Sequence, residues 1–179
     1  MEYKFTFKNG DYLQLKSFKH SEFASEETHC YEATVYFNRN KIGTVLNRGN
    51  GGADDFHADK PFAENNKIWR YLEDRIKSEH PKYHMDFDDS WNEMSMEVWC
   101  CDQVNKFLSY KDFKNYMRSK VVFTDSKSDD PKAVRFVSFK STKKIEQKHI
   151  DFIANRNPSY SILNKMPESE ALDVWMTGA

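Results

Sequence analysis

The chain has 179 residues, of which 39% are apolar, 31% are charged and 15% are aromatic. Its 27 aromatic side chains need an interior in which to pack, so the composition excludes a disordered tail, a collagen-like repeat and a coiled coil. The net charge is −1, which by itself favours neither nucleic acid nor an anionic membrane as a partner. No apolar run approaches the roughly 18 residues that a membrane-spanning helix requires, and we expect no membrane partner.

The cysteines and the N-terminus indicate a reducing compartment. Cys30, Cys100 and Cys101 are an odd number, and they lack the CxxC spacing of zinc or thiol-redox sites. Residues 1–8 alternate apolar with polar or charged side chains, without the apolar core of a signal peptide. We therefore expect a cytoplasmic protein.

Alternating side chains predict strands in the first part of the chain. Tyr3, Phe5 and Phe7 alternate with polar residues before an Asn-Gly hairpin signal. Three further segments have the β-branched and aromatic composition of strands, namely 12–18, 30–37 and 42–46. Residues 21–28 are polar and acidic and are expected to form a loop. The first 47 residues therefore predict a four-stranded antiparallel β-meander.

The middle of the chain changes to a helical period. Ile68, Leu72 and Ile76 keep one face of a helix, which ends before Pro81. Two adjacent apolar stripes predict a second, widely buried helix. The stripes are Trp91, Met94, Val98, Cys101, Val104 and Leu108, and Met96, Cys100, Gln103 and Phe107. Ser109 and Asp112 match a capping box, which would open a separate short helix.

The last third predicts a mixture of strands and helices. Strands are expected at 121–124, 133–139 and 159–163. One helix is expected after a cap at Thr142, and a short terminal helix opens at Pro167. The fold class is therefore α+β, with an N-terminal antiparallel β-meander, a helical middle and a C-terminal β-hairpin with helices. We expect a single domain, 1–179, in which a subdivision near residue 60 would separate 1–60 from 61–179.

A glycine-rich loop follows the fourth predicted strand. Four of the six glycines fall between Gly43 and Gly52. Their freedom to adopt left-handed backbone angles suits a tight turn or a nest of N–H groups that binds an anion, but the Lys-Ser/Thr end of a P-loop is missing. A tight exit from the strand and a ligand or partner site both stay open, and Asn47, Arg48 and Asn50 are candidate binding residues.

Two segments and the strand between them carry a resemblance to known proteins. The segments are Phe23-Ala-Ser-Glu-Glu-Thr-His-Cys30 and Gly43-Thr-Val-Leu-Asn-Arg-Gly-Asn-Gly-Gly52. Over about residues 20–57 the chain resembles small uncharacterised proteins of bacteriophages and bacterial mobile elements. The resemblance implies a bacterial host cytoplasm and an accessory role. Such proteins often bind a host macromolecule, and some inhibit host defence.

Two groups of carboxylates and histidines are candidate metal ligands. Asp54, Asp55, His57 and Asp59 form the first group, and oxygen-rich groups of this kind suit Mg²⁺ or Mn²⁺. His84, Asp86, Asp88 and Asp89 form the second. Carboxylates just before a helix also cap its free N–H groups, and this structural explanation is favoured for the second group. No cofactor is expected, with a divalent metal as the alternative.

The net charge conceals two opposed blocks. Residues 51–102 carry 13 acids and 6 bases, whereas residues 103–157 carry 13 bases and 6 acids. Lys140, Lys143 and Lys144 lie in the basic block and are candidate binding residues. A basic surface with aromatic neighbours suits nucleic acid or an acidic protein, although lysine-rich faces are also commonly only solvated.

We favour a non-enzymatic function, because no complete catalytic constellation is present. The main hypothesis is a phage- or mobile-element-type accessory protein that binds a host protein or nucleoprotein, with inhibition of a host defence system as one form. One alternative is a metal-dependent hydrolase or nuclease that uses Asp54, Asp55 and His57. The other is a nucleic-acid-binding protein that uses the basic segment 103–157.

Overall fold

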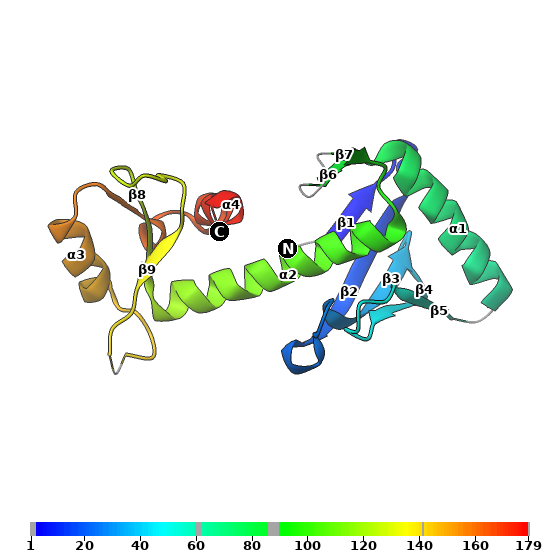
Figure 1. Cartoon of the computed structure of the whole chain (residues 1–179), viewed down its shortest axis with the longest axis horizontal. Helices are drawn as coiled ribbons and strands as arrows, with labels where there is room; N and C mark the ends of the chain where they lie inside the picture. Colours follow the sequence, from blue (N-terminus) through cyan, green and yellow to red (C-terminus); the bar gives the residue numbers. More distant parts are fainter. Residues whose placement is uncertain (1–2, 60–61, 86–89, 141, 179) are drawn as a thin grey trace. The chain divides into compact units, whose positions relative to one another are not determined.

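A computed structural model describes residues 3–59, 62–85, 90–140 and 142–178, and the fold class is α+β, as the sequence predicted. Contacts divide the chain into two compact units, Met1–Lys106 and Phe107–Ala179. Each unit has a sheet of its own (Figure 1). The boundary between the two units falls inside a long helix. The expectation that the chain is a single domain stays a prediction.

The first unit is built on a five-stranded antiparallel sheet, in which each strand pairs with the next one along the chain. The strands are β1 (Tyr3–Thr6), β2 (Tyr12–Ser21), β3 (Cys30–Phe37), β4 (Asn40–Asn47) and β5 (Asp55–Ala58). The first four confirm the predicted meander. The sequence does not predict β5, because Asp55 and His57 are polar and exposed, but Phe56 pairs opposite Val45 and completes the sheet.

Two helices, α1 (Phe62–Glu79) and α2 (Met96–Ser119), cover one face of this sheet. The side chains that the sheet turns to this face include Leu13, Leu15, Tyr31, Ala33, Val35 and Val45, all buried. The helices contribute Leu72, Ile76, Met96, Trp99, Cys100 and Val104, which are also buried. Phe56 of β5 stacks on Trp69 of α1 with ring centroids 4.2 Å apart. Removal of these apolar side chains from water is the main force that holds the helices on the sheet.

A short hairpin precedes α2, formed by β6 (Tyr83–Met85) and β7 (Ser90–Asn92). Trp91 lies in β7 and is 67% exposed, so its assignment to the buried helical stripe is wrong. Its spacing from Met94 fits a helix by coincidence, since the chain turns helical only at Met96. Cys101 is also exposed, whereas Cys100 and Gln103 of the second stripe are buried as expected.

Helix α2 continues without a break through the position at which a second helix was predicted. The capping-box interpretation of Ser109 and Asp112 is therefore wrong. The Oγ of Ser109 accepts a hydrogen bond from Nε1 of Trp175 at 3.0 Å, so this serine serves a contact with a distant part of the chain. A local sequence pattern cannot distinguish that contact from a cap.

The second unit has a three-stranded antiparallel sheet in the order β10-β8-β9. Its elements are β8 (Val121–Asp125), β9 (Arg135–Val137), α3 (Gln147–Arg156), β10 (Tyr160–Ile162) and α4 (Glu168–Gly178). One apolar cluster joins Phe113, Val122 and Trp175, and another joins Val121, Phe123 and Ile153. The N-cap of helix α3 is Glu146, four residues after the predicted cap Thr142. There the backbone N–H of Glu146 donates to Nδ1 of His149 at 3.1 Å.

Short 3₁₀ turns complete both units, at Glu22–Ala24 in the first and at Leu163–Lys165 in the second. Among the described residues, none of the helices combines the length and the apolar composition that a membrane crossing requires.

Lys111 tests the continuity of α2, because its side chain is exposed and its backbone lies in the interior of the helix. A proline there would remove an intrahelical hydrogen bond, and Lys111→Pro should lower the free energy of unfolding by about 3 kcal/mol. If a helix began after Ser109, position 111 would lie in its first turn and would tolerate proline. Urea unfolding with Lys111→Ala as the control distinguishes the two, since equal stability of both variants would contradict a continuous helix.

Candidate functional site

Two connections meet at one end of the five-stranded sheet, and together they are called the loop pair here. The first, residues 22–29, joins β2 to β3, and the second, residues 48–54, joins β4 to β5. Consecutive antiparallel hairpins bring every second connection to the same end of a sheet, and Tyr31 pairs opposite Asn47 at that end. The two connections therefore lie side by side.

Gly49 fastens the two connections to each other. Its carbonyl oxygen accepts hydrogen bonds from the backbone N–H groups of Glu26, Glu27 and Thr28, at 3.0, 2.9 and 3.3 Å. Gly49 has φ +89°, and a Cβ at this position would lie 2.0 Å from the carbonyl oxygen of Ala24. The contact therefore requires glycine for both its backbone angle and its close approach.

Asn47 organises the loop pair from inside, where it is only 7% exposed. Its Oδ1 accepts hydrogen bonds from the Thr28 hydroxyl and from the Gly49 N–H, each at 2.8 Å. Its Nδ2 donates to the Gly52 carbonyl at 2.9 Å and to Oδ1 of Asp54 at 3.0 Å. The amide thus uses all of its donors and acceptors to hold the loop.

Asp54 points inward from the glycine-rich loop, toward the helix-covered side of the sheet. The hydroxyl of Tyr31 donates to its Oδ2 at 2.5 Å. Burial raises the pKa of Asp54 above its ordinary value of 3.8, against the hydrogen bonds from Tyr31 and Asn47, which lower it. Burial also raises the pKa of the Tyr31 phenol, and the neighbouring Cys100 and Asp54 add to that shift.

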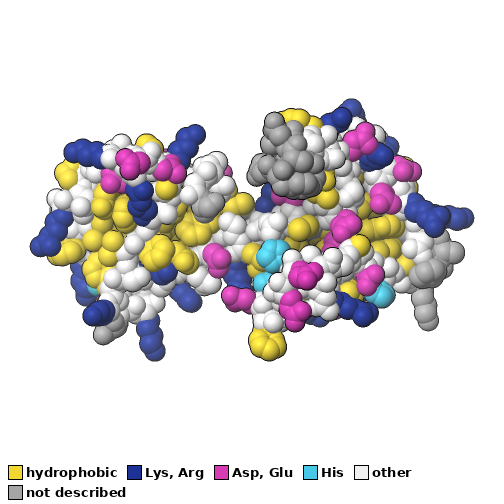
Figure 2. Space-filling view, viewed as in Figure 1, with side chains coloured by type: hydrophobic (Ala, Val, Ile, Leu, Met, Phe, Trp, Pro, Cys, Tyr) yellow, Lys and Arg dark blue, Asp and Glu magenta, His cyan; other side chains and the backbone are white. Residues whose placement is uncertain are grey.

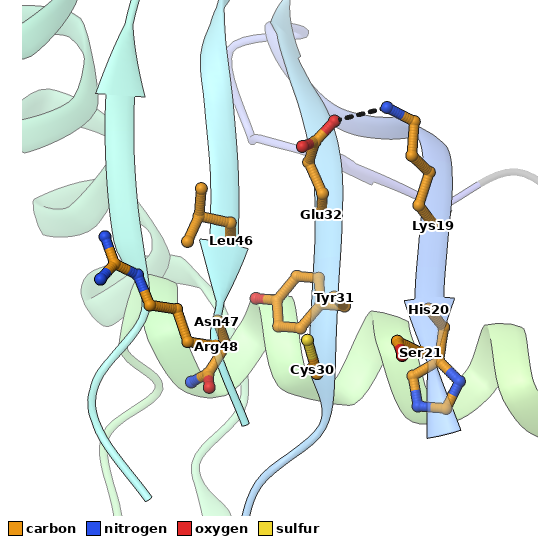
Figure 3. Close-up of a pocket in the computed structure, with 9 residues that line it drawn as sticks. All are labelled: Lys19, His20, Ser21, Cys30, Tyr31, Glu32, Leu46, Asn47 and Arg48. Atoms are coloured by element: carbon orange, nitrogen blue, oxygen red, sulfur yellow. Dashed lines mark hydrogen bonds and ion pairs between the residues drawn. The ribbon is translucent and has the colours of Figure 1, made fainter. Parts of the chain in front are cut away.

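Three hollows border the loop pair. One of about 470 Å³ opens beside the ends of β2, β3 and β4 (Figure 3). A second of about 410 Å³ is lined by residues of the glycine-rich loop, and a third of about 370 Å³ lies between residues 25–29 and α2. Across the third hollow, Nε2 of His29 is 2.8 Å from Oδ1 of Asn105.

The 470 Å³ hollow combines cationic and apolar side chains. Lys19, His20 and Arg48 border it together with Cys30 and Leu46 (Figure 3). The ammonium of Lys19 is paired with Glu32 at 2.8 Å, and Nε2 of His20 lies 3.3 Å from the Ser25 hydroxyl. Glu32 also lines this hollow and offsets the charge of Lys19, so the lining mixes charged groups of both signs with apolar side chains.

The predicted loop residues fall into two sets. Four of them border the hollows, namely Asn47, Arg48, Asn50 and Asp55. The metal-site interpretation needs Asp54, Asp55 and His57 together, but successive residues of a strand point to opposite faces. Asp55 and His57 are exposed on the outer face, whereas Asp54 is hydrogen-bonded on the inner side.

Metal-ligand clusters are not seen in the described parts of the chain, where no three His, Cys, Asp or Glu residues are grouped to hold an ion. Asp86, Asp88 and Asp89 of the second predicted group lie outside the described residues. Its fourth member, His84, belongs to β6.

The candidate lysines of the basic block belong to the second unit. Lys140, Lys143 and Lys144 lie in the connection between β9 and α3, not on a helix. Other lysines of the block are paired with carboxylates, such as Lys114 with Glu168 and Lys148 with Glu146, each at 2.8 Å. Figure 2 shows Lys and Arg side chains around much of the outline of the unit 107–179.

The sequence does not single out several residues of the site. No local pattern identifies Phe23, Lys19 and His20 as site residues, because a lone aromatic or basic residue in a polar stretch fits many environments. Tyr31 could have been found, since strand alternation places it on the apolar face beside Ala33 and Val35.

Comparisons with protein-family models, with curated proteins and with solved structures find no match.

Gly49 provides a sharp test of the loop pair, because Gly10 is a matched control. Both have a positive φ, +89° and +87°, but nothing lies within 4 Å of a Cβ at Gly10. Gly10→Ala should cost about 1 kcal/mol for the left-handed backbone alone. Gly49→Ala should cost at least about 2 kcal/mol more, since it also breaks the contact with Ala24. Urea unfolding measures both, and equal losses would contradict the close approach.

Asp54 predicts a pH-dependent stability. Its pKa lies above 3.8 in the folded protein and near 3.8 in the unfolded chain. Between these values only the folded state keeps the proton, so the contribution of Asp54 to the free energy of unfolding increases as the pH falls through the folded pKa. Below the unfolded value the contribution levels off.

The measurement is the difference in unfolding free energy between the wild type and Asp54→Asn from about pH 7 to about pH 3.5, because subtraction cancels the other carboxylates. The wild type should gain stability relative to the variant as the pH falls. A difference that does not change with pH would contradict the burial of the carboxylate.

Proposed function

We propose that the protein is an accessory protein of the bacteriophage or mobile-element kind that binds a host protein through the loop pair. The observation that carries the proposal is Phe23, whose side chain is 100% exposed in the first connection. Burial of a phenylalanine side chain is worth roughly 1.5–3 kcal/mol, and a partner that covers Phe23 would gain this free energy. The resemblance to phage and mobile-element proteins covers both segments of the loop pair.

The backbone that carries Phe23 is held on both sides. The Ser25 hydroxyl donates to the Ser21 carbonyl at 2.8 Å and accepts from the Cys30 N–H at 2.9 Å. Three further N–H groups are held by Gly49. Because little freedom is left to lose on association, a partner can bind this loop at a low entropic cost. Phe23 thus has the character of an interface hot spot, an aromatic anchor on a fixed frame.

The charge around Phe23 indicates the chemistry of the partner. Glu22, Glu26 and Glu27 are exposed, and residues 21–28 contain no Lys or Arg. Within the described chain, no ion pair joins these three carboxylates to a basic residue. In Figure 2, Asp and Glu side chains gather on the first unit near the segment that follows β2. The complementary surface is an apolar socket with a rim of Lys and Arg.

Capture from a bacterial lysate, followed by direct titration, tests this interface. Wild type, Phe23→Ser and Phe152→Ser serve as baits, and Phe152 is the matched control because it is an exposed phenylalanine in the second unit. A protein retained by the wild type and by Phe152→Ser is identified, purified and titrated. Loss of a hot-spot aromatic should weaken its binding by about 30-fold in Phe23→Ser.

A charge-reversal variant tests the acidic rim separately. Glu22→Lys/Glu26→Lys should slow association and invert the salt dependence of the rate, because both residues act at long range through the solvent. Phe23→Ser should leave the free energy of unfolding within about 0.5 kcal/mol of the wild type, since the side chain is fully exposed. Equal affinity of Phe23→Ser and wild type for every captured protein, or no protein captured by the wild type, would contradict the proposal.

A further inference from the structure

The outer face of the five-stranded sheet points away from α1 and α2, and among the described residues its side chains are not fully buried. Figure 3 looks onto this face at the ends of β2, β3 and β4, with α2 behind the sheet. Strand alternation places Lys16, Thr34, Thr44 and His57 in one row across it. The outward residues of β2–β5 are exposed or half-buried, whereas the inward residues of β3 are buried. A sheet face that is left open in this way is available to a ligand.

Two tyrosine rings on this face each lie under an ammonium group. The Lys4 Nζ is 4.1 Å from the ring centroid of Tyr12, and the Lys16 Nζ is 4.8 Å from that of Tyr36. Tyr36 stands opposite Gln14 of β2 and Lys41 of β4, so a second lysine is the cross-strand neighbour of this ring. Each ammonium group approaches its ring from the solvent, so the ring face beneath it is the one that a ligand can reach.

The outer face is basic within a unit that is acidic as a whole. Residues 1–106 carry 14 bases and 19 acids. The outer face nevertheless presents four lysines, Lys4, Lys16, Lys19 and Lys41, against the three carboxylates of Glu32, Asp55 and Asp59. Lys19 and Lys41 have carboxylate partners, whereas Lys4 and Lys16 form no ion pair within the described chain and lie over the tyrosine rings.

We propose that this outer face binds single-stranded nucleic acid, an activity that is independent of the host-protein interface at the loop pair. Bases stack on the rings of Tyr12 and Tyr36, and the exposed lysines that lie over these rings move aside to contact the phosphates. Every base has a flat π-face, so stacking on aromatic side chains recognises a single strand without a strict sequence preference. Phosphate contacts release counterions, which makes the affinity fall with salt. A duplex keeps its bases inside and cannot stack on these rings.

Fluorescence anisotropy with labelled oligo-dT and oligo-U of about 12 nucleotides tests the proposal on the full chain, with a duplex of the same length for comparison. The expected result is binding of the single strands, weaker binding of the duplex, and an affinity that decreases as salt increases. Tyr36→Phe keeps the ring and should retain wild-type affinity. Tyr36→Leu keeps an apolar side chain without the ring and should weaken binding by about 10-fold.

A lysine pair and a lysine triplet locate the binding surface. Lys4→Ala/Lys16→Ala should weaken binding and lower the steepness of log affinity against log salt by about 1.4, because two phosphate contacts to a single strand are lost. The matched control, Lys140→Ala/Lys143→Ala/Lys144→Ala, removes cations of the second unit and should bind as the wild type does. Thermal unfolding of each variant confirms that it is folded.

Three outcomes would overturn the proposal. The wild type could fail to bind either oligonucleotide at low salt, or Tyr36→Phe and Tyr36→Leu could bind with equal affinity. In the third outcome, the lysine triplet variant loses binding but the lysine pair variant does not. The last result would assign nucleic-acid binding to the basic segment instead. Phe23→Ser should bind oligonucleotides normally, so failure here and failure of the host-protein interface are distinguishable.

Discussion

The packing of two helices on a single face of the five-stranded sheet determines which side chains of the first unit can meet a partner. Apolar residues such as Val35 and Val45 turn toward α1 and α2, where they are buried and inaccessible to a partner. Because the strand period is two, their neighbours along each strand must turn to the opposite face. The polar residues of β2 to β5 are therefore arranged by the same register that builds the core. A change that shifted one strand by a residue would disturb both faces together.

The loop pair depends on this register as well. Asn47 ends β4 on the inner face, where it reaches Thr28 of one connection and Asp54 of the other. Gly49 then brings its carbonyl within reach of three N–H groups. The resulting frame holds Phe23 in the solvent without giving it any contact that would bury it. This exposed aromatic side chain is the one that we propose a partner protein covers.

Much of the fold could be predicted from local patterns, and the exceptions share a physical cause. Alternation and helical period identify β1–β4 and both apolar helices, because the core imposes these periods on the sequence. β5 and the continuity of α2 escape prediction, since Asp55 meets solvent and Ser109 bonds to a tryptophan 66 residues away. The site follows the same division. Asn47, Arg48 and Asn50 could be proposed from the glycine-rich loop, whereas Phe23 carries no local mark that separates it from a core phenylalanine.

The uneven placement of charge in the first unit has a consequence for how it meets other molecules. The acidic connection at one end and the lysines of the outer face give the unit an electric dipole, although its net charge is modest. A dipole experiences a torque in the field of a highly charged polymer or surface, so the unit is rotated before contact and presents a defined side first. Orientation of this kind is screened at separations beyond about 8–10 Å at physiological salt. The dipole therefore orients the unit only in the last step of an encounter, and distant charges have little effect on it.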